Sequence, residues 1–216
     1  MTSLIMSSAQ KGKIAVLCIA LLLAVGTLPQ RAAALAGPQD NVRAFYDTLL
    51  TTMKNSRMLG QSGRYARLAP VVARVFDLPS MTRLAIGATW ASLSPAQQQQ
   101  LTEAFAHYVS ATYADRFDSF SGEQLQVTGE QPYNQDVIVQ TKIVKANGDV
   151  TTLNYMMHQN QGTWQISDVY LDGTISQLAT QRSEFHSILR REGVEGLVAA
   201  LNRKVDLLSR GVAKSS

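Results

Sequence analysis

Residues 136–160 read DVIVQTKIVKANGDVTTLNYMMHQN, in which apolar and polar side chains alternate on both sides of a central Asn147-Gly148 pair. A period of two residues is typical of a β-strand that buries one face. The alternating positions are Val137, Val139, Thr141 and Ile143 before the pair, and Leu153, Tyr155 and Met157 after it. Asn-Gly favours the tight turn of a β-hairpin, because both central positions of that turn need a positive φ angle. This stretch therefore predicts two antiparallel strands.

The alternation continues on both sides of this hairpin. Leu125 and Val127 begin an earlier strand, and Asn160-Gln161-Gly162 turns the chain into a later strand that carries Val169 and Leu171. Consecutive strands joined by short turns form an antiparallel meander, and the polar alternate positions leave its other face to solvent. We predict a four-stranded antiparallel meander that needs cover on one face only.

Helical periodicity fills the chain before and after these strands. The predicted helices span about 40–53, 65–76, 81–90, 95–121, 174–191 and 194–208. Ser94-Pro95-Ala96-Gln97 is a capping box with proline at the first helical position. Asp172-Gly173-Thr174 is expected to end the last strand and to cap the first of the two C-terminal helices, and Glu192-Gly193 to separate these helices. The fold class is therefore α+β, a four-stranded antiparallel meander sheet with helices packed on one face.

The first 36 residues have the charged, apolar and small-residue order of a secretory signal peptide. Lys11 and Lys13 precede an apolar run from Ile14 to Leu28, and small residues follow up to Ala36. The run has about 15 residues, fewer than the roughly 20 that cross a bilayer core, so an uncleaved membrane anchor is the weaker interpretation. We expect cleavage near Ala36, release into the periplasm, and one domain formed by residues 37–216.

Charge and motifs argue against several function classes. Residues 37–216 keep 17 of the 20 basic residues and all 16 acidic ones, with no basic run longer than two, so nucleic acid is not an expected partner. The sequence lacks the motifs of nucleophile elbows, zinc proteases, dinucleotide-binding loops and phosphate-binding loops. His107, His158 and His186 have no metal-ligand spacing, and the single cysteine, Cys18, lies in the predicted signal peptide. We predict no metal, no cofactor and no catalytic activity.

Several motifs, taken in their order along the chain, are similar to those of one family. They are Tyr65-x-x-Leu68-x-Pro70, Val75-Phe76-Asp77-Leu78-Pro79-x-Met81-x-Arg83-Leu84, Ser94-Pro95-x-Gln97, Thr112-Tyr113, Trp164-x-Ile166-x-Asp168-Val169-x-Leu171-Asp172-Gly173-Thr174, and Gly193-x-x-Gly196-Leu197. With these motifs the chain resembles the MlaC / toluene-tolerance family of periplasmic phospholipid-binding proteins. Phe117-Asp118-x-Phe120-x-Gly122-Glu123 is similar to a branch of that family associated with hopanoid biosynthesis.

The resemblance implies a carrier that shuttles a phospholipid or hopanoid ligand between the inner and outer membranes. It also implies two protein partners, an inner-membrane lipid transport complex and an outer-membrane lipoprotein. Burying a methylene group is worth about 0.8 kcal/mol, so exposing two chains of about 16 carbons to water costs on the order of 25 kcal/mol. A carrier must therefore offer a dry, elongated apolar cavity between sheet and helices, with an open end for the polar head.

The candidate lipid-binding residues are the apolar side chains of the inner sheet face and of the helices that cover it. From the sheet they are Val137, Val139, Ile143, Leu153, Tyr155, Met157, Val169 and Leu171. From the helices they are Phe76, Leu84, Phe105, Val109, Tyr113, Phe185, Ile188, Leu189, Leu197 and Leu201. The sequence leaves open whether they line a cavity or fill a core. A small enzyme acting on a hydrophobic substrate, with Tyr155 or Asp168 in the cavity, and a non-catalytic periplasmic interaction module are the alternatives.

Overall fold

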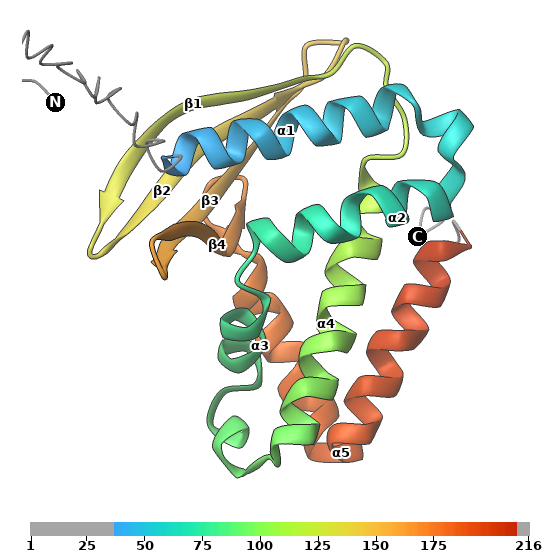
Figure 1. The fold of residues 1–216 in the computed structure, drawn as a ribbon, viewed down its shortest axis with the longest axis vertical. Coiled ribbons are helices and arrows are strands. Elements are labelled where there is room, and N and C mark those ends of the chain that lie inside the picture. The colour runs from blue at the N-terminus through green and yellow to red at the C-terminus, as the bar shows by residue number, and fades with distance from the viewer. Residues whose placement is uncertain (1–36, 211–216) are drawn as a thin grey trace, which may run out of the picture. The chain divides into compact units, whose positions relative to one another are not determined.

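Helices precede and follow the strands in the computed structural model, which describes residues 37–210 (Figure 1). The predicted signal peptide, residues 1–36, lies outside the described residues. The elements are α1 (Pro38–Lys54), α2 (Ser56–Val75), α3 (Leu78–Ile86), the 3₁₀ helix η1 (Gly87–Ser92), α4 (Pro95–Arg116), β1 (Gln124–Tyr133), β2 (Asp136–Val144), β3 (Val150–Asn160), β4 (Thr163–Leu171), β5 (Ile175–Ser176) and α5 (Gln177–Ser209). The predicted α+β class with an antiparallel sheet is confirmed.

The sheet follows the predicted meander, with every strand antiparallel to the one before it. The turn at its centre differs from the predicted one, because Gly148 has a φ of 89° whereas Asn147 does not reach positive φ. Gly148 N donates to Lys145 O at 2.9 Å, and Lys145 N donates to Asp149 O at the same distance. Inside the Lys145–Asp149 pair the turn therefore has three residues, Ala146 to Gly148, and it ends on a glycine in the left-handed region.

A fifth strand, β5, corrects the predicted count of four. Ile175 pairs with Leu171, and Ser176 pairs with Tyr170. Asp172-Gly173-Thr174 follows the end of β4, as predicted, but the predicted cap is wrong, because this segment forms the turn between β4 and β5. Helix α5 begins three residues later than expected, and its N-cap is Ser176, whose hydroxyl accepts from Ala179 N at 2.9 Å. A strand of two residues is too short to leave an alternating pattern in the sequence.

Two helix boundaries are confirmed by their hydrogen bonds and dihedral angles. The Ser94 hydroxyl accepts from Gln97 N at 3.3 Å, and Gln97 Oε1 accepts from Ser94 N at 3.1 Å, which completes the capping box. Gly193 interrupts α5 with a φ of 70°, between the two predicted C-terminal helices. By contrast, α2 begins earlier than the pattern predicted, at Ser56, and is interrupted at Gly60 with a φ of 59°.

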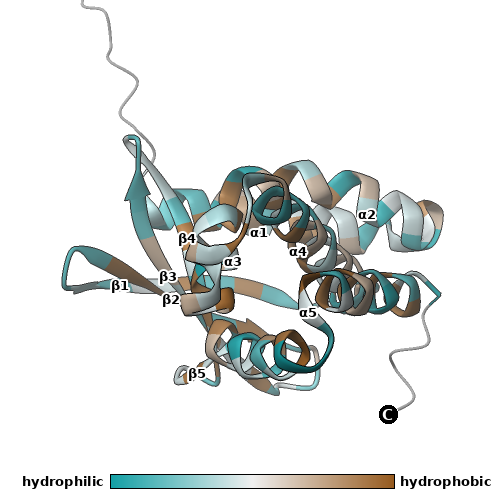
Figure 2. Cartoon of the chain, turned by 90° about the horizontal axis from the view of Figure 1, so that it is seen from below, coloured by the Kyte–Doolittle hydropathy of each residue, from teal (hydrophilic) through white to brown (hydrophobic). Residues whose placement is uncertain are grey.

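Helix α1 packs against β1, β2 and β4, whereas α2, α3 and α5 contact the sheet through β4 (Figure 1). Helix α4 packs against α2, α3 and α5. The predicted packing of helices on one sheet face thus holds for α1, whereas α4 and α5 pair with each other on the β4 side. Apolar residues gather where these elements face one another (Figure 2). No helix within residues 37–210 is both long and apolar enough to cross a membrane.

Aromatic side chains from helices α1 and α4, from the residue after α2 and from the sheet meet in the core. The Phe45 ring of α1 lies edge-on to Phe76 at 5.6 Å between centroids, to Tyr113 of α4 at 5.2 Å, and to Tyr155 of β3 at 6.5 Å. Edge-to-face pairs of this kind each add about 0.5–1.5 kcal/mol beyond their buried area. This cluster holds α1, α4 and the sheet together, and two of its rings, Phe76 and Tyr113, also form the wall of a pocket.

Candidate functional site

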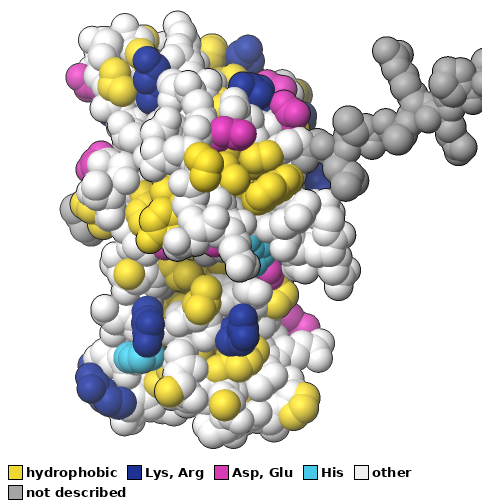
Figure 3. Space-filling model, turned by 90° about the vertical axis from the view of Figure 1, so that its left-hand side faces the viewer, with side chains coloured by type: hydrophobic (Ala, Val, Ile, Leu, Met, Phe, Trp, Pro, Cys, Tyr) yellow, Lys and Arg dark blue, Asp and Glu magenta, His cyan; other side chains and the backbone are white. Residues whose placement is uncertain are grey.

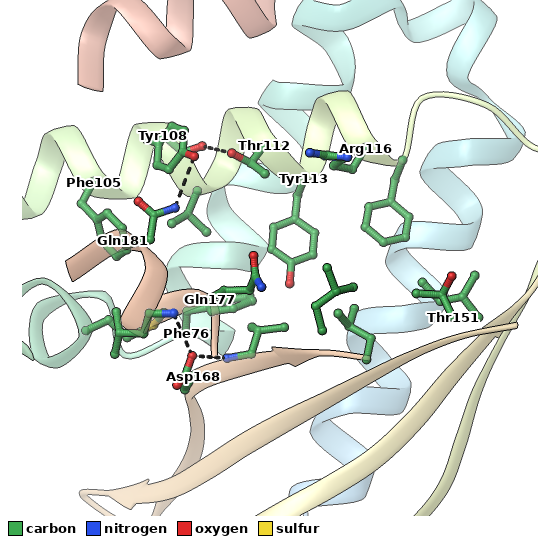
Figure 4. Close-up of a pocket in the computed structure, with 18 residues that line it drawn as sticks. Phe76, Phe105, Tyr108, Thr112, Tyr113, Arg116, Thr151, Asp168, Gln177 and Gln181 are labelled. Carbon is green, nitrogen blue, oxygen red and sulfur yellow. Dashed lines mark hydrogen bonds between the residues drawn. The ribbon is translucent and has the colours of Figure 1, made fainter. Parts of the chain in front are cut away.

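A pocket with a volume of about 340 Å³ lies between α4, the start of α5 and strands β2 to β4 (Figure 4). Ligand pockets in proteins commonly have about 300–1,000 Å³. Its wall consists of Phe76, Met81, Phe105, Tyr108, Val109, Thr112, Tyr113, Arg116, Phe117, Ile143, Thr151, Leu153, Asp168, Val169, Leu171, Gln177, Leu178 and Gln181. The site is thus built from segments that are far apart in the sequence.

Aromatic and aliphatic side chains form most of this wall. Phe76 and Phe105 are buried, and the ring of Tyr113 stacks in parallel on that of Phe117 at 5.7 Å. Met81 adds a flexible, polarizable side chain that adapts to ligands of different shape. An apolar ligand would therefore meet aromatic rings mainly on the helical side and branched aliphatic groups on the sheet side.

The polar side chains of the wall lie mainly on two helices. Tyr108, Thr112 and Arg116 follow one another at four-residue intervals along α4, so they share one helix face (Figure 4). Across from them, Gln181 of α5 donates from Nε2 to the Tyr108 hydroxyl at 3.3 Å, while its Oε1 is buried without a hydrogen-bond partner. Gln177 stands one turn earlier on α5. The pocket therefore has a polar row between α4 and α5 beside its apolar wall.

Asp168 is the one carboxylate in the wall formed by the described residues, and its hydrogen bonds engage both oxygens. Oδ1 accepts from Val169 N at 2.7 Å and from Leu178 N at 3.1 Å, and Oδ2 accepts from the Ser176 hydroxyl at 2.5 Å. These bonds tie β4 to β5 and to the first turn of α5. The position of Asp168 is thus explained by the start of α5.

The groups that commonly carry catalysis are scarce in this wall. None of the residues that form the wall, within the described range 37–210, is a histidine or a cysteine. Burial raises the pKa of Tyr113 well above its ordinary value, so this hydroxyl is neutral at physiological pH. Tyr155, one of the two residues considered for an enzyme, is completely buried and does not reach the wall. No group of three or more metal-ligating side chains occurs in the described part of the chain.

Eight of the candidate residues from the sequence line the pocket. They are Phe76, Phe105, Val109, Tyr113, Ile143, Leu153, Val169 and Leu171. Seven others are buried but do not reach the wall: Val139, Tyr155, Met157, Phe185, Ile188, Leu197 and Leu201. These seven pack on neighbouring side chains in the core. That any of the eight contacts a lipid stays a prediction.

The remaining three candidates lie elsewhere. Leu84 is 49 % exposed on α3, whereas Met81 and Ala85 of the same helix are buried. Val137 is half-buried near the start of β2, and Leu189 borders a separate pocket beside η1. Hydrophobic side chains also gather on the surface, across the middle of the face drawn in Figure 3. Apolar character alone therefore did not separate pocket, core and surface.

Sequence reasoning missed the polar half of the wall. Tyr108, Thr112, Arg116, Gln177 and Gln181 were not among the candidates. The four-residue spacing of the first three, next to the apolar positions Phe105, Val109 and Tyr113, was a usable signal, because it places both sets on neighbouring strips of one helix. The signal was ambiguous, since polar residues on a helix more often face solvent.

Comparison with known proteins agrees with this architecture. A family model described as MlaC protein matches residues 43–203. A phospholipid-binding protein from Ralstonia solanacearum, whose structure was determined in complex with a phospholipid, has a similar fold, with a TM-score of 0.70. The two sequences are 23 % identical, and the match covers 81 % of this chain and 99 % of the other. At that identity the likeness establishes the fold, and the family model covers most of the chain. The chain belongs to the MlaC family.

Proposed function

We propose that this chain is a periplasmic lipid carrier, which holds the apolar part of a membrane lipid in the pocket and shuttles it between the inner and outer membranes. One observation carries the proposal. This chain, a member of the MlaC family, has a pocket with a mostly apolar wall, whose polar side chains lie largely on α4 and α5. The phospholipid bound by the similar protein from Ralstonia solanacearum supports this use of the fold.

The volume of the pocket limits how much lipid it holds in this conformation. A cavity of about 150 Å³ holds one benzene molecule, or about 25 Å³ for each carbon atom. By this scale a pocket of about 340 Å³ accommodates about 14 carbons, close to one acyl chain, whereas two chains of about 16 carbons need roughly 800 Å³. A two-chain cargo would therefore have to widen the gap between α4, α5 and the sheet.

The same scale gives a binding energy that still allows release. About 14 methylene groups removed from water contribute roughly 11 kcal/mol. Association costs an estimated 4–15 kcal/mol in lost translational and rotational freedom. The two terms are of similar size, so a pocket of this volume retains lipid without holding it irreversibly.

Export and partners complete the proposal. Residues 1–36 would direct the chain to the periplasm, and residues 37–216 would form the lipid-binding domain. The cargo is a phospholipid or a hopanoid. We infer an inner-membrane lipid transport complex and an outer-membrane lipoprotein as partners, because the resemblance to the MlaC family implies them. The sequence has no nucleotide-binding motif, so the direction of lipid transport would be set by these partners.

The carrier is proposed to be non-catalytic. The wall has no histidine or cysteine among the described residues, and its one carboxylate is engaged by three donors. An enzyme for a hydrophobic substrate would require a reactive group at the pocket surface, and a pure interaction module would leave the pocket empty. The interaction module therefore predicts that the purified protein carries no lipid.

Lipid mass spectrometry on protein purified from the periplasm without detergent tests the proposal. We expect close to one lipid for each protein chain, seen in the native spectrum and again after organic extraction. The spectrum also distinguishes phospholipid from hopanoid. Folded protein that stays empty after incubation with lipid vesicles would contradict the carrier function and favour the interaction module.

A further inference from the structure

Arg116 is the one cation in the pocket wall formed by the described residues. It is the last residue of α4, and its side chain is exposed. Within residues 37–210 the Arg116 guanidinium has no ion pair and no hydrogen bond, whereas the charge of Asp168 is engaged by three donors. The pocket therefore carries one positive charge that is not matched by its own carboxylate.

The neighbouring Asp115 does not neutralise this charge. Asp115 is buried, and its electrostatic partner is Arg64 of α2. The Arg64 side chain donates from Nε to Ala114 O at 2.8 Å, which places this pair on the α2 side of α4. Successive residues of a helix point about 100° apart, so Asp115 and Arg116 face different neighbours. The Arg116 side chain therefore remains available to a ligand in the pocket.

Arg116 stands at the end of the polar row Tyr108, Thr112, Arg116, while the buried rings of Phe76 and Phe105 line another part of the pocket (Figure 4). An amphipathic lipid bound there would place its chain against the rings and its head beside the exposed arginine. The C-terminus of a helix carries a partial negative charge, which disfavours an anion. A cation at that end of α4 offsets this repulsion for an anionic headgroup.

We propose that Arg116 binds the phosphate of the cargo headgroup, so that the carrier prefers lipids that carry a phosphate over neutral lipids with the same chains. This inference rests on the proposed lipid-carrier function and names its ligand class. The planar guanidinium fits a phosphate through two parallel N–H···O bonds, which a hydroxyl headgroup does not match. Because the pair is exposed, the preference is modest, about two- to five-fold.

The test uses vesicles of a phosphate-free glycolipid that contain equal amounts of phosphatidic acid and diacylglycerol with identical chains. Wild-type protein is equilibrated with them and re-isolated, and its bound lipids are quantified by mass spectrometry. We expect phosphatidic acid to exceed diacylglycerol by about two- to five-fold. Arg116→Gln should bring the ratio near one, and Arg116→Glu should lower it further. The amount of diacylglycerol taken up from vesicles without phosphatidic acid should not change.

Arg83→Gln is the matched control, because Arg83 is an exposed arginine of α3 outside the pocket wall and has no ion pair among the described residues. An excess of inorganic phosphate tests whether Arg116 binds free phosphate instead of a lipid headgroup. It should leave the bound lipid in place, since an exposed ion pair alone contributes little to lipid binding. A wild-type ratio in Arg116→Gln, or an equal loss in Arg83→Gln, overturns the inference but not the carrier. Wild-type protein that takes up neither lipid overturns both.

Discussion

Filling the pocket from α4 should empty it of lipid. Val109 belongs to the pocket wall. Tryptophan has about seven more heavy atoms than valine, so Val109→Trp fills roughly 175 Å³ at about 25 Å³ for each atom. This is about half of the 340 Å³ pocket. A lipid chain would lose about seven methylene-sized contacts, worth roughly 5–6 kcal/mol, which corresponds to about four orders of magnitude in affinity.

The assay is the lipid content of the purified variant, measured by extraction and mass spectrometry for each mole of protein. Val150→Trp is the matched control, because Val150 is 57 % exposed on β3 and lies outside the pocket wall. It should keep the wild-type lipid content. If Val109→Trp does not fold, Ile143→Phe adds volume from the sheet side of the same pocket. A folded pocket-filling variant with wild-type lipid content would refute the argument that this pocket holds the chain.

Two further predictions concern stability. Burial raises the pKa of Tyr113 above 10.0, so the folded chain keeps a proton that the unfolded chain releases at high pH. The free energy of unfolding should therefore be unaffected below about pH 10 and fall above it. Tyr113→Phe should reduce that fall by up to about 1.4 kcal/mol per pH unit, measured by urea titrations at several pH values. Equal pH slopes in both proteins would contradict this. Asp168→Ala should lower the free energy of unfolding by about 2–3 kcal/mol, because three donors lose their acceptor. The exposed Asp206→Ala should change it by less than about 0.5 kcal/mol, and similar values for the two variants would argue against the role of Asp168.

Local sequence was sufficient where structure depends on near neighbours. The alternation around Asn147-Gly148 predicted the central hairpin, since side chains of a strand point to opposite faces whatever lies beyond them. Ser94 and Gln97 predicted the start of α4, and Gly193 the interruption of α5, because caps and breaks are satisfied within a few residues. The order of motifs along the chain predicted the MlaC family.

The sequence was less informative where one short contact decided the outcome. β5 has two residues; Asp172-Gly173 reverses the chain before it, and Asp168 accepts from Ser176 and from Leu178 beside it. No pattern marks so short a strand. The turn at Asn147-Gly148 likewise has three residues instead of the predicted two, since only Gly148 of this pair has a positive φ.

Only the tertiary structure decided which apolar residues face empty space. Val139 and Leu153 lie on adjacent strands and have the same alternating pattern, yet Val139 is completely buried in the core and Leu153 lines the pocket. Core and pocket wall select the same residue types, because both remove apolar surface from water. What separates them is whether a neighbouring side chain fills the space beside each residue, which depends on how the helices and the sheet pack. The same packing places Arg116, the last residue of α4, in the wall of the proposed lipid site.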